Sequence, residues 1–184
     1  MNLATQITIA RILLIPFFVI AVVYYRPEAL YFKWIAVALF FVASVSDAID
    51  GYVARVRKEQ TALGSFLDPF ADKSLLISAF ISINFSGGFL YKISRWILIV
   101  ILSREVIIIS GLVILFFTHR EVKINPTFLG KMTTVAQMAT VGALLIEYWW
   151  VNWVAYLAAF LTILSGLGYV FREARRVNHV TPTS

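Results

Sequence analysis

The chain has 184 residues, of which 60% are hydrophobic and 14% are charged, and its mean hydropathy is +0.84. This composition is too apolar for a soluble domain and predicts an all-α integral membrane protein. The net charge of +6 is spread over the ends of apolar stretches, so we expect contact with membrane lipids and no nucleic-acid partner. The absence of cysteine excludes disulfides and thiolate metal ligands.

Six apolar stretches of about 20 residues are each long enough to cross a bilayer, so we expect six transmembrane helices. They run from Ile7 to Tyr25, Leu30 to Val53, Gly64 to Phe85, Ile93 to Phe117, Phe128 to Trp149 and Val151 to Phe171. A short interfacial segment is expected before the first of them. The connections are short and no internal repeat is visible, which predicts a single membrane domain over residues 1–184.

The positive charges predict the orientation of this domain. With six spans both termini share one side, which would hold Arg11, Arg55, Arg57, Lys58, Lys73, Arg120, Lys123, Lys131, Arg172, Arg175 and Arg176. The other side would hold Arg26, Lys33, Lys92 and Arg95, with Arg104 left in mid-span. Eleven positive charges against four place both termini in the cytoplasm, and a bacterial inner or plasma membrane is the expected location.

Four aspartates lie where the second stretch ends and the third begins. Asp47 and Asp50 are three residues apart, and Asp68 and Asp72 are four apart, so each pair shares one helical face. A short cytoplasmic turn would bring the two pairs together, so the active site is expected on the cytoplasmic side. Because a carboxylate in a membrane helix costs roughly 2.5–3.5 kcal/mol, such a cluster requires compensating positive charge.

The compensating positive charge has two possible sources. The aspartates could face water and pair with the basic residues of segment 55–58, or they could bind divalent cations. Two same-face pairs favour cations, and four aspartates offer the hard oxygen donors that suit magnesium, manganese or calcium. Two divalent ions in such a site clamp a phosphate ester during displacement at phosphorus. The sequence therefore favours phosphoryl-type transfer at a membrane surface.

The aspartates belong to a longer pattern, Asp47-x-x-Asp50-Gly51-x-x-Ala54-Arg55 followed by Gly64-x-x-x-Asp68-x-x-x-Asp72. It resembles the signature of the CDP-alcohol phosphatidyltransferases at every defining position. The resemblance implies a six-helix homodimeric membrane enzyme with two Mg²⁺ or Mn²⁺ ions and a CDP-linked donor, here CDP-diacylglycerol, that releases CMP. It implies metal ligands at Asp47, Asp50, Asp68 and Asp72, a general base at Asp72, and CDP-binding residues at Gly51, Ala54, Arg55 and Gly64.

The acceptor is expected to be glycerol-based, because the chain most resembles the phosphatidylglycerophosphate synthases and the CMP-forming cardiolipin synthases. The former commonly carry two further positive charges, where this chain has Val113 and Thr133. We therefore favour phosphatidylglycerol as the acceptor, with glycerol 3-phosphate as the alternative. Lys73, Arg104 and Lys131 are the candidate acceptor-binding residues.

Each of these three cations has another interpretation. Arg104 lies beside Glu105 in a predicted span, so an ion pair is as well founded as a substrate contact. Lys73 could balance the charge of the neighbouring aspartates, and Lys131 could anchor a helix at the membrane edge. A cation transporter would also carry acidic residues inside a membrane, but these usually lie near the midplane of repeated halves.

Overall fold

The structure, a computed structural model, describes the backbone of residues 3–57, 62–117 and 128–178 and the side chains of residues 6–46, 64, 66–114, 117 and 128–168. The described residues form six α-helices and no strand, as the sequence predicts. The helices are α1 (Leu3–Tyr24), α2 (Leu30–Arg57), α3 (Ala62–Phe85), α4 (Arg95–Phe117), α5 (Phe128–Leu145) and α6 (Val151–Asn178).

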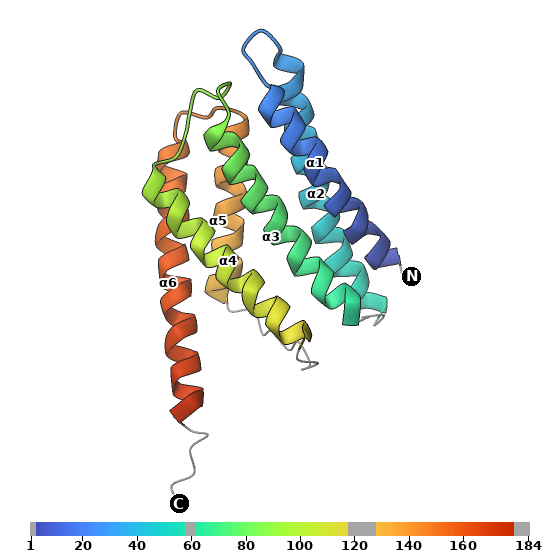
Figure 1. Ribbon diagram of the computed structural model, residues 1–184, viewed down its shortest axis with the longest axis vertical. Helices are drawn as coiled ribbons and strands as arrows, with labels where there is room; N and C mark the ends of the chain where they lie inside the picture. Colours follow the sequence, from blue (N-terminus) through green and yellow to red (C-terminus); the bar gives the residue numbers. More distant parts are fainter. Residues whose placement is uncertain (1–2, 58–61, 118–127, 179–184) are drawn as a thin grey trace, which may run out of the picture.

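Helix α3 connects the two halves of the bundle (Figure 1). On one side α1 packs against both α2 and α3, and on the other α5 packs against α6. Helix α4 contacts α3 and α6 and runs obliquely across one face of the bundle. The start of α1 and the end of α6 lie at the same end of the bundle, as an even number of membrane crossings requires.

Large apolar side chains from several helices form the core. Phe18 of α1, Phe80 of α3 and Ile101 of α4 are completely buried in it. Helix α6 contributes small side chains such as Ala155 and Ala158, which permit the close approach of neighbouring helices. The centre of the bundle is therefore a closely packed apolar layer, and the polar residues of the site lie outside it.

Apolar side chains also cover the outside of the bundle. Phe17 on α1, Ile107 on α4 and Phe160 on α6 are each more than half exposed, as lipid-facing residues are. Within the part of the chain that is described, three stretches are long and apolar enough to cross a membrane: Gln6–Tyr24, Arg95–Ile114 and Val151–Gly168. The predicted all-α membrane class is confirmed, while the sidedness of the two termini stays a prediction.

Several helices extend beyond the predicted apolar stretches. Helix α2 continues to Arg57 where the prediction ends at Val53, and α6 continues to Asn178 where the prediction ends at Phe171. Hydropathy marks the segment that suits lipid, but arginine, glutamate and alanine continue a helix equally well outside it. Helix α1 begins at Leu3, so the expected interfacial segment is continuous with the first helix in the described residues.

Helix α5 is shorter than predicted, ending at Leu145 and not at Trp149. Glu147 adopts a left-handed backbone conformation with φ of 57°, which a continuing right-handed helix does not allow. The N–H of Tyr148 donates to the carbonyl of Ala143 at 2.8 Å and closes the helix end. An apolar stretch gives no signal for such a turn, because the residues on both sides of it are hydrophobic.

The Glu147 carboxylate joins three connections at the end of the bundle opposite the acidic residues. It accepts hydrogen bonds from Lys33 Nζ at 2.5 Å, from the backbone N–H of Leu90 at 2.9 Å and from the Tyr25 hydroxyl at 3.3 Å. Lys33 lies in the first turn of α2, Leu90 lies in the α3–α4 connection, and Tyr25 directly follows α1. The carboxylate therefore fixes the ends of both halves of the bundle relative to each other.

The same end of the bundle contains two titratable groups with shifted pKa values and one glycine in close contact with a backbone carbonyl. Burial alone would raise the pKa of Glu147, but the hydrogen bond and charge of Lys33 and the N–H of Leu90 hold it below its usual value. Burial and the neighbouring Glu147 charge raise the pKa of the Tyr25 hydroxyl. A Cβ atom on Gly88 would lie 2.1 Å from the Tyr25 carbonyl oxygen, so only glycine fits there.

Candidate active site

Helix α3 places Gly64, Asp68 and Asp72 on one face, because they follow one another at four-residue intervals. Gly64 is buried, and both aspartates are partly buried. The prediction that Asp68 and Asp72 share a helical face is therefore confirmed. Each is only partly exposed, so a charge on either side chain needs neighbours that compensate it.

Helix α1 supplies a neighbour to the first of these aspartates. The hydroxyl of Thr8, a completely buried residue, donates a hydrogen bond to Oδ1 of Asp68. Arg11 lies three residues later on the same face of α1, and its side chain is only 2% exposed. A hydrogen bond to one carboxylate oxygen fixes the orientation of the side chain.

The remaining residues of the predicted motif lie on α2. Asp47, Asp50, Gly51, Ala54 and Arg55 are all within this helix, but their side chains lie outside the described residues. Among the side chains that are described, no group of three or more histidine, aspartate or glutamate residues is arranged to hold a metal ion. Whether the two aspartate pairs meet therefore stays a prediction, as does their binding of two divalent ions.

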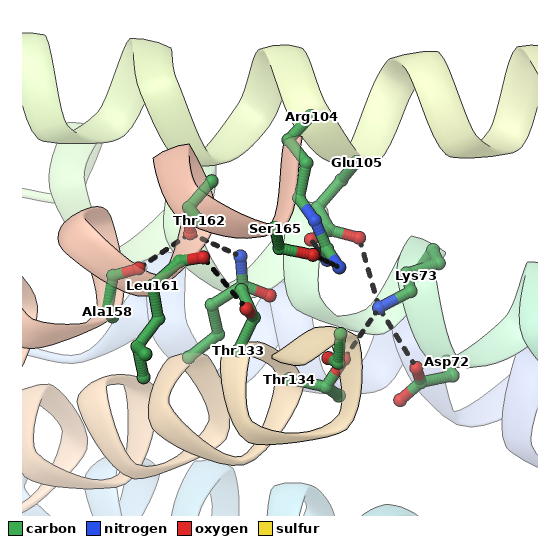
Figure 2. Close-up of polar contacts among 12 residues, drawn as sticks. Asp72, Lys73, Arg104, Glu105, Thr133, Thr134, Ala158, Leu161, Thr162 and Ser165 are labelled. Atoms are coloured by element: carbon green, nitrogen blue, oxygen red, sulfur yellow. Dashed lines mark hydrogen bonds and ion pairs between the residues drawn. The ribbon is translucent and has the colours of Figure 1, made fainter. Parts of the chain in front are cut away.

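The ammonium group of Lys73 is surrounded by polar atoms from three helices (Figure 2). Its Nζ lies 3.1 Å from Oε2 of Glu105 on α4, 3.1 Å from the Thr134 hydroxyl on α5 and 3.5 Å from Oδ2 of Asp72 on α3. The lysine side chain is 9% exposed and that of Asp72 is 14% exposed. Lys73 therefore lies directly beside the predicted general base, in a largely buried site.

Arg104 joins the same cluster from α4. Its Nη1 donates to Oε1 of Glu105 at 2.5 Å, and its Nη2 lies 3.4 Å from the hydroxyl of Ser165 on α6. Glu105 is completely buried and holds Arg104 with one carboxylate oxygen and Lys73 with the other. The ion pair of Arg104 with Glu105, left open by the sequence, is present, and it brings two of the three candidate acceptor-binding cations together.

A polar seam between α5 and α6 continues from this cluster (Figure 2). The Thr133 hydroxyl lies 2.7 Å from the carbonyl of Leu129 and 3.1 Å from that of Leu161. The amide nitrogen of Gln137 donates to the Thr162 hydroxyl at 3.3 Å. Thr133, where a lysine is common in phosphatidylglycerophosphate synthases, is thus completely buried and engaged in helix packing.

Lys131, the third candidate acceptor-binding cation, is exposed on the first turn of α5. It lies three residues before Thr134, on the same side of that helix. It makes no ion pair with any residue whose side chain is described. The structure thus leaves both of its interpretations, acceptor binding and membrane anchoring, in place.

Sequence reasoning assigned no role in the site to Thr8, Thr134 or Ser165, and it treated Glu105 only as a partner of Arg104. A glutamate in the middle of the otherwise apolar α4 is a usable signal, because such residues are costly in a membrane. The three hydroxyl residues carry no such signal. Threonine and serine are common in membrane helices, and only the packing of α1, α5 and α6 against α3 and α4 selects these.

Comparison with known proteins shows the family to which the chain belongs. Residues 1–164 match the family model described as CDP-alcohol phosphatidyltransferase. A CDP-diacylglycerol–glycerol-3-phosphate 3-phosphatidyltransferase of Haemophilus influenzae is 38% identical, with 92% of this chain and 91% of the relative covered. The Bacillus subtilis protein of the same name is 36% identical, with coverages of 91% and 93%.

A probable phosphatidylglycerophosphate synthase of Mycobacterium tuberculosis is 29% identical, with all of this chain and 87% of the relative covered. The residues matched by the family model include the acidic motif, Lys73, Arg104 and Glu105. The predicted resemblance is therefore confirmed, and the chain belongs to the CDP-alcohol phosphatidyltransferase family.

Proposed function

We propose that this enzyme transfers the phosphatidyl group of CDP-diacylglycerol to glycerol 3-phosphate and releases CMP. The names of the Haemophilus influenzae and Bacillus subtilis relatives state this donor and this acceptor. They favour glycerol 3-phosphate, the alternative acceptor, over the phosphatidylglycerol that the sequence led us to prefer. The family assignment also places the chain among transferases and not among cation transporters.

The observation that carries this proposal is the position of Lys73 beside Asp72, at 3.5 Å. The acceptor requires a base for its hydroxyl and positive charge for its phosphate, and this pair offers both within one helical turn. Arg104, joined to Lys73 through Glu105, adds a guanidinium that suits a phosphate group. Lys131, exposed on the first turn of α5, would contribute a further positive charge.

In the proposed reaction, Asp72 accepts the proton of the glycerol 3-phosphate hydroxyl. The resulting oxygen attacks the phosphorus that carries the diacylglycerol group and forms a new P–O bond. The P–O bond to CMP breaks, and CMP leaves with the electron pair. Gly51, Ala54, Arg55 and Gly64 would bind the cytidine diphosphate, where glycines and alanine allow a close approach of the ligand.

Two divalent cations, Mg²⁺ or Mn²⁺, would be held by Asp47, Asp50, Asp68 and Asp72. Asp68 and Asp72 fit such ions, because they offer hard oxygen donors from one helical face and Thr8 orients the first of them. When bound, the ions would neutralise the diphosphate of the donor and the charge on the departing CMP. The base role of Asp72 and the ligand roles of all four aspartates are parts of the proposal.

The acceptor can be identified directly with purified protein in detergent micelles that contain CDP-diacylglycerol and Mg²⁺. Glycerol 3-phosphate and phosphatidylglycerol are offered in separate reactions, CMP release is measured, and the lipid product is identified by mass. We expect phosphatidylglycerol phosphate from glycerol 3-phosphate, and no CMP after chelation of the metal. Cardiolipin from phosphatidylglycerol, with no reaction of glycerol 3-phosphate, would overturn the proposed acceptor and restore the one favoured by the sequence.

The proposal includes a homodimer in a bacterial inner or plasma membrane with the active site facing the cytoplasm. The excess of positive charge on the expected terminal side supports this orientation. It also suits the reaction, because CDP-linked donors and glycerol 3-phosphate are charged molecules that do not cross a bilayer.

A further inference from the structure

Glu105 is a completely buried carboxylate in the middle of the apolar helix α4. It lies within Arg95–Ile114, a stretch of α4 that is long and apolar enough to cross a membrane. A charged residue in such a helix is costly, because the hydrocarbon layer does not solvate it as water does. The proposed reaction gives this residue no chemical step, so its position needs another explanation.

The two oxygens of Glu105 engage two different cations (Figure 2). Oε1 lies 2.5 Å from Nη1 of Arg104, and Oε2 lies 3.1 Å from Nζ of Lys73. Lys73 belongs to α3 and Arg104 to α4, so the carboxylate bridges the helices that carry the two positive charges. Thr134 and Ser165 add one contact each from α5 and α6, which fixes the direction of both side chains.

The charges of the cluster balance when Glu105 is present: Asp72 and Glu105 are negative, and Lys73 and Arg104 are positive. Without Glu105, Asp72 is the carboxylate nearest to Lys73 among the described side chains, at 3.5 Å. Lys73, which already forms an ion pair with Asp72, would then have this proposed base as its one carboxylate partner among the described side chains. Arg104 and Lys73 would also repel each other, because no anion would separate them.

The cluster retains capacity for an anion. Arg104 has five N–H donors, of which its contacts with Glu105 and Ser165 use two among the described residues. Together, Lys73, Arg104 and Glu105 carry one net positive charge beside Asp72. A phosphate monoester approaching from Asp72 would therefore meet two oriented cations, and Asp72 and Glu105 are the two carboxylates that oppose it.

We propose that Glu105 is a positioning residue for the acceptor: it holds Lys73 and Arg104 in the arrangement that binds the acceptor phosphate, and it shares the ammonium group of Lys73 with Asp72. This inference rests on the proposed function, since it assumes a phosphorylated acceptor. Glu105 acts through the two cations and does not touch the reacting atoms. Loss of its charge must therefore weaken the binding of the acceptor and spare the binding of the lipid donor.

The test is a steady-state comparison of wild type with Glu105→Gln, in which the KM values for glycerol 3-phosphate and CDP-diacylglycerol are measured separately. Loss of a charge-assisted contact predicts a KM for glycerol 3-phosphate raised by about ten- to a hundredfold. The KM for CDP-diacylglycerol should change by less than about twofold. A role limited to folding would lower the amount of active enzyme and leave both KM values unchanged.

Glu147→Gln is the matched control. It also removes a carboxylate paired with a lysine at 2.5 Å, but at the opposite end of the bundle. Thirteen residues separate Glu147 from Thr134, which corresponds to roughly 20 Å along a helix. We expect this control to leave both KM values at the wild-type level.

A double-mutant cycle with Lys73→Met tests whether Glu105 acts through the lysine. In the Lys73→Met background, Glu105→Gln should raise the KM for glycerol 3-phosphate by no more than about threefold, because only Arg104 remains to be positioned. If Glu105→Gln does not accumulate in the membrane, Glu105→Asp replaces it. Aspartate keeps the charge but is too short to reach both cations, so the same selective rise in KM is expected.

Three results would overturn the inference. They are an unchanged KM for glycerol 3-phosphate, an equal rise in both KM values, and single-variant effects that multiply fully in the double variant. A wild-type enzyme that gives no product with glycerol 3-phosphate would overturn the proposed function as well. An active wild type with an unaffected Glu105→Gln variant would overturn this inference alone.

Discussion

Replacing Glu147 by glutamine tests how much the polar junction at the end of the bundle stabilises the fold. The carboxylate accepts hydrogen bonds from Lys33 and Tyr25 with one oxygen and from Leu90 with the other, and glutamine can still accept from Leu90 with its single carbonyl oxygen. What it loses is the negative charge beside Lys33. The side chains of the pair are only 12% and 18% exposed, so solvent screens the interaction incompletely.

The expected loss follows from this burial. A fully exposed ion pair contributes about 0.2–1 kcal/mol, whereas a hydrogen bond to a charged group in a protected site contributes about 1.5–3 kcal/mol. The 2.5 Å contact and the low exposure of both side chains make this pair comparable to a hydrogen bond to a charged group in a protected site. We therefore expect Glu147→Gln to lower the free energy of unfolding by about 2 kcal/mol.

The assay is unfolding of the purified protein in mixed micelles with an increasing fraction of SDS. Tryptophan fluorescence reports the transition, since Trp149 and Trp150 follow Glu147 directly. Glu28→Gln is the control, because Glu28 is an exposed carboxylate in the α1–α2 connection, and its change should stay within about 0.5 kcal/mol. Equal unfolding curves for Glu147→Gln and Glu28→Gln would refute the stabilising role of the junction.

The same pair has a pH dependence with a defined sign. The pKa of Glu147 lies below its usual value in the folded protein, so its charge stabilises the fold at pH values above the unfolded-state pKa. The contribution is lost as the pH falls through the folded-state pKa. The difference between wild type and Glu147→Gln should therefore be constant between about pH 6 and 8 and shrink below about pH 4.

Three further predictions concern the site and the packing at the far end. Asp72→Asn should lower kcat for CMP release by about a hundredfold or more with unchanged thermal stability, and near wild-type turnover would contradict its role as base. Thr8→Val should weaken Mn²⁺ binding by about tenfold or more, because it removes the hydrogen bond to Asp68. Electron paramagnetic resonance measures this binding, and Thr8→Ser, which keeps a hydroxyl, should leave it unchanged. Gly88→Ala should destabilise the protein by about 2 kcal/mol or more in the SDS assay, because its Cβ would overlap a backbone oxygen. Gly87→Ala, where no atom lies within 4 Å of an added Cβ, should leave the stability nearly unchanged. Equal losses of stability in the two glycine variants would contradict a destabilising overlap at Gly88.

Hydropathy was sufficient to predict the helices, because a chain in a membrane must satisfy its backbone hydrogen bonds within each crossing segment. The ends of the helices were less predictable. Helix α5 ends at Leu145, and the turn after it places Glu147 against Lys33 and the N–H of Leu90, which are distant in the sequence. Helix α2 runs on to Arg57 because its polar last turns continue the helix outside the apolar stretch.

The site was predictable where it depends on spacing within one helix. The four-residue interval of Asp68 and Asp72 fixes their common face, and the structure confirms it. The contacts of Lys73 with Glu105 and Thr134 join residues 32 and 61 positions away, and no local pattern encodes which helices become neighbours. The aspartate motif also did not predict the acceptor. The residues around Lys73, and not the aspartates, are expected to select it.

The distribution of the cluster over four helices has an evolutionary consequence. The four aspartates of the motif belong to α2 and α3. Three of the side chains that surround Lys73 and Arg104, in contrast, belong to α4, α5 and α6. Substitutions in these last three helices can therefore change the charge and shape around the acceptor while the aspartate motif stays intact. One scaffold could in this way acquire a new alcohol substrate through a few changes at Glu105, Thr134 or Ser165, without rebuilding the chemistry that cleaves the donor.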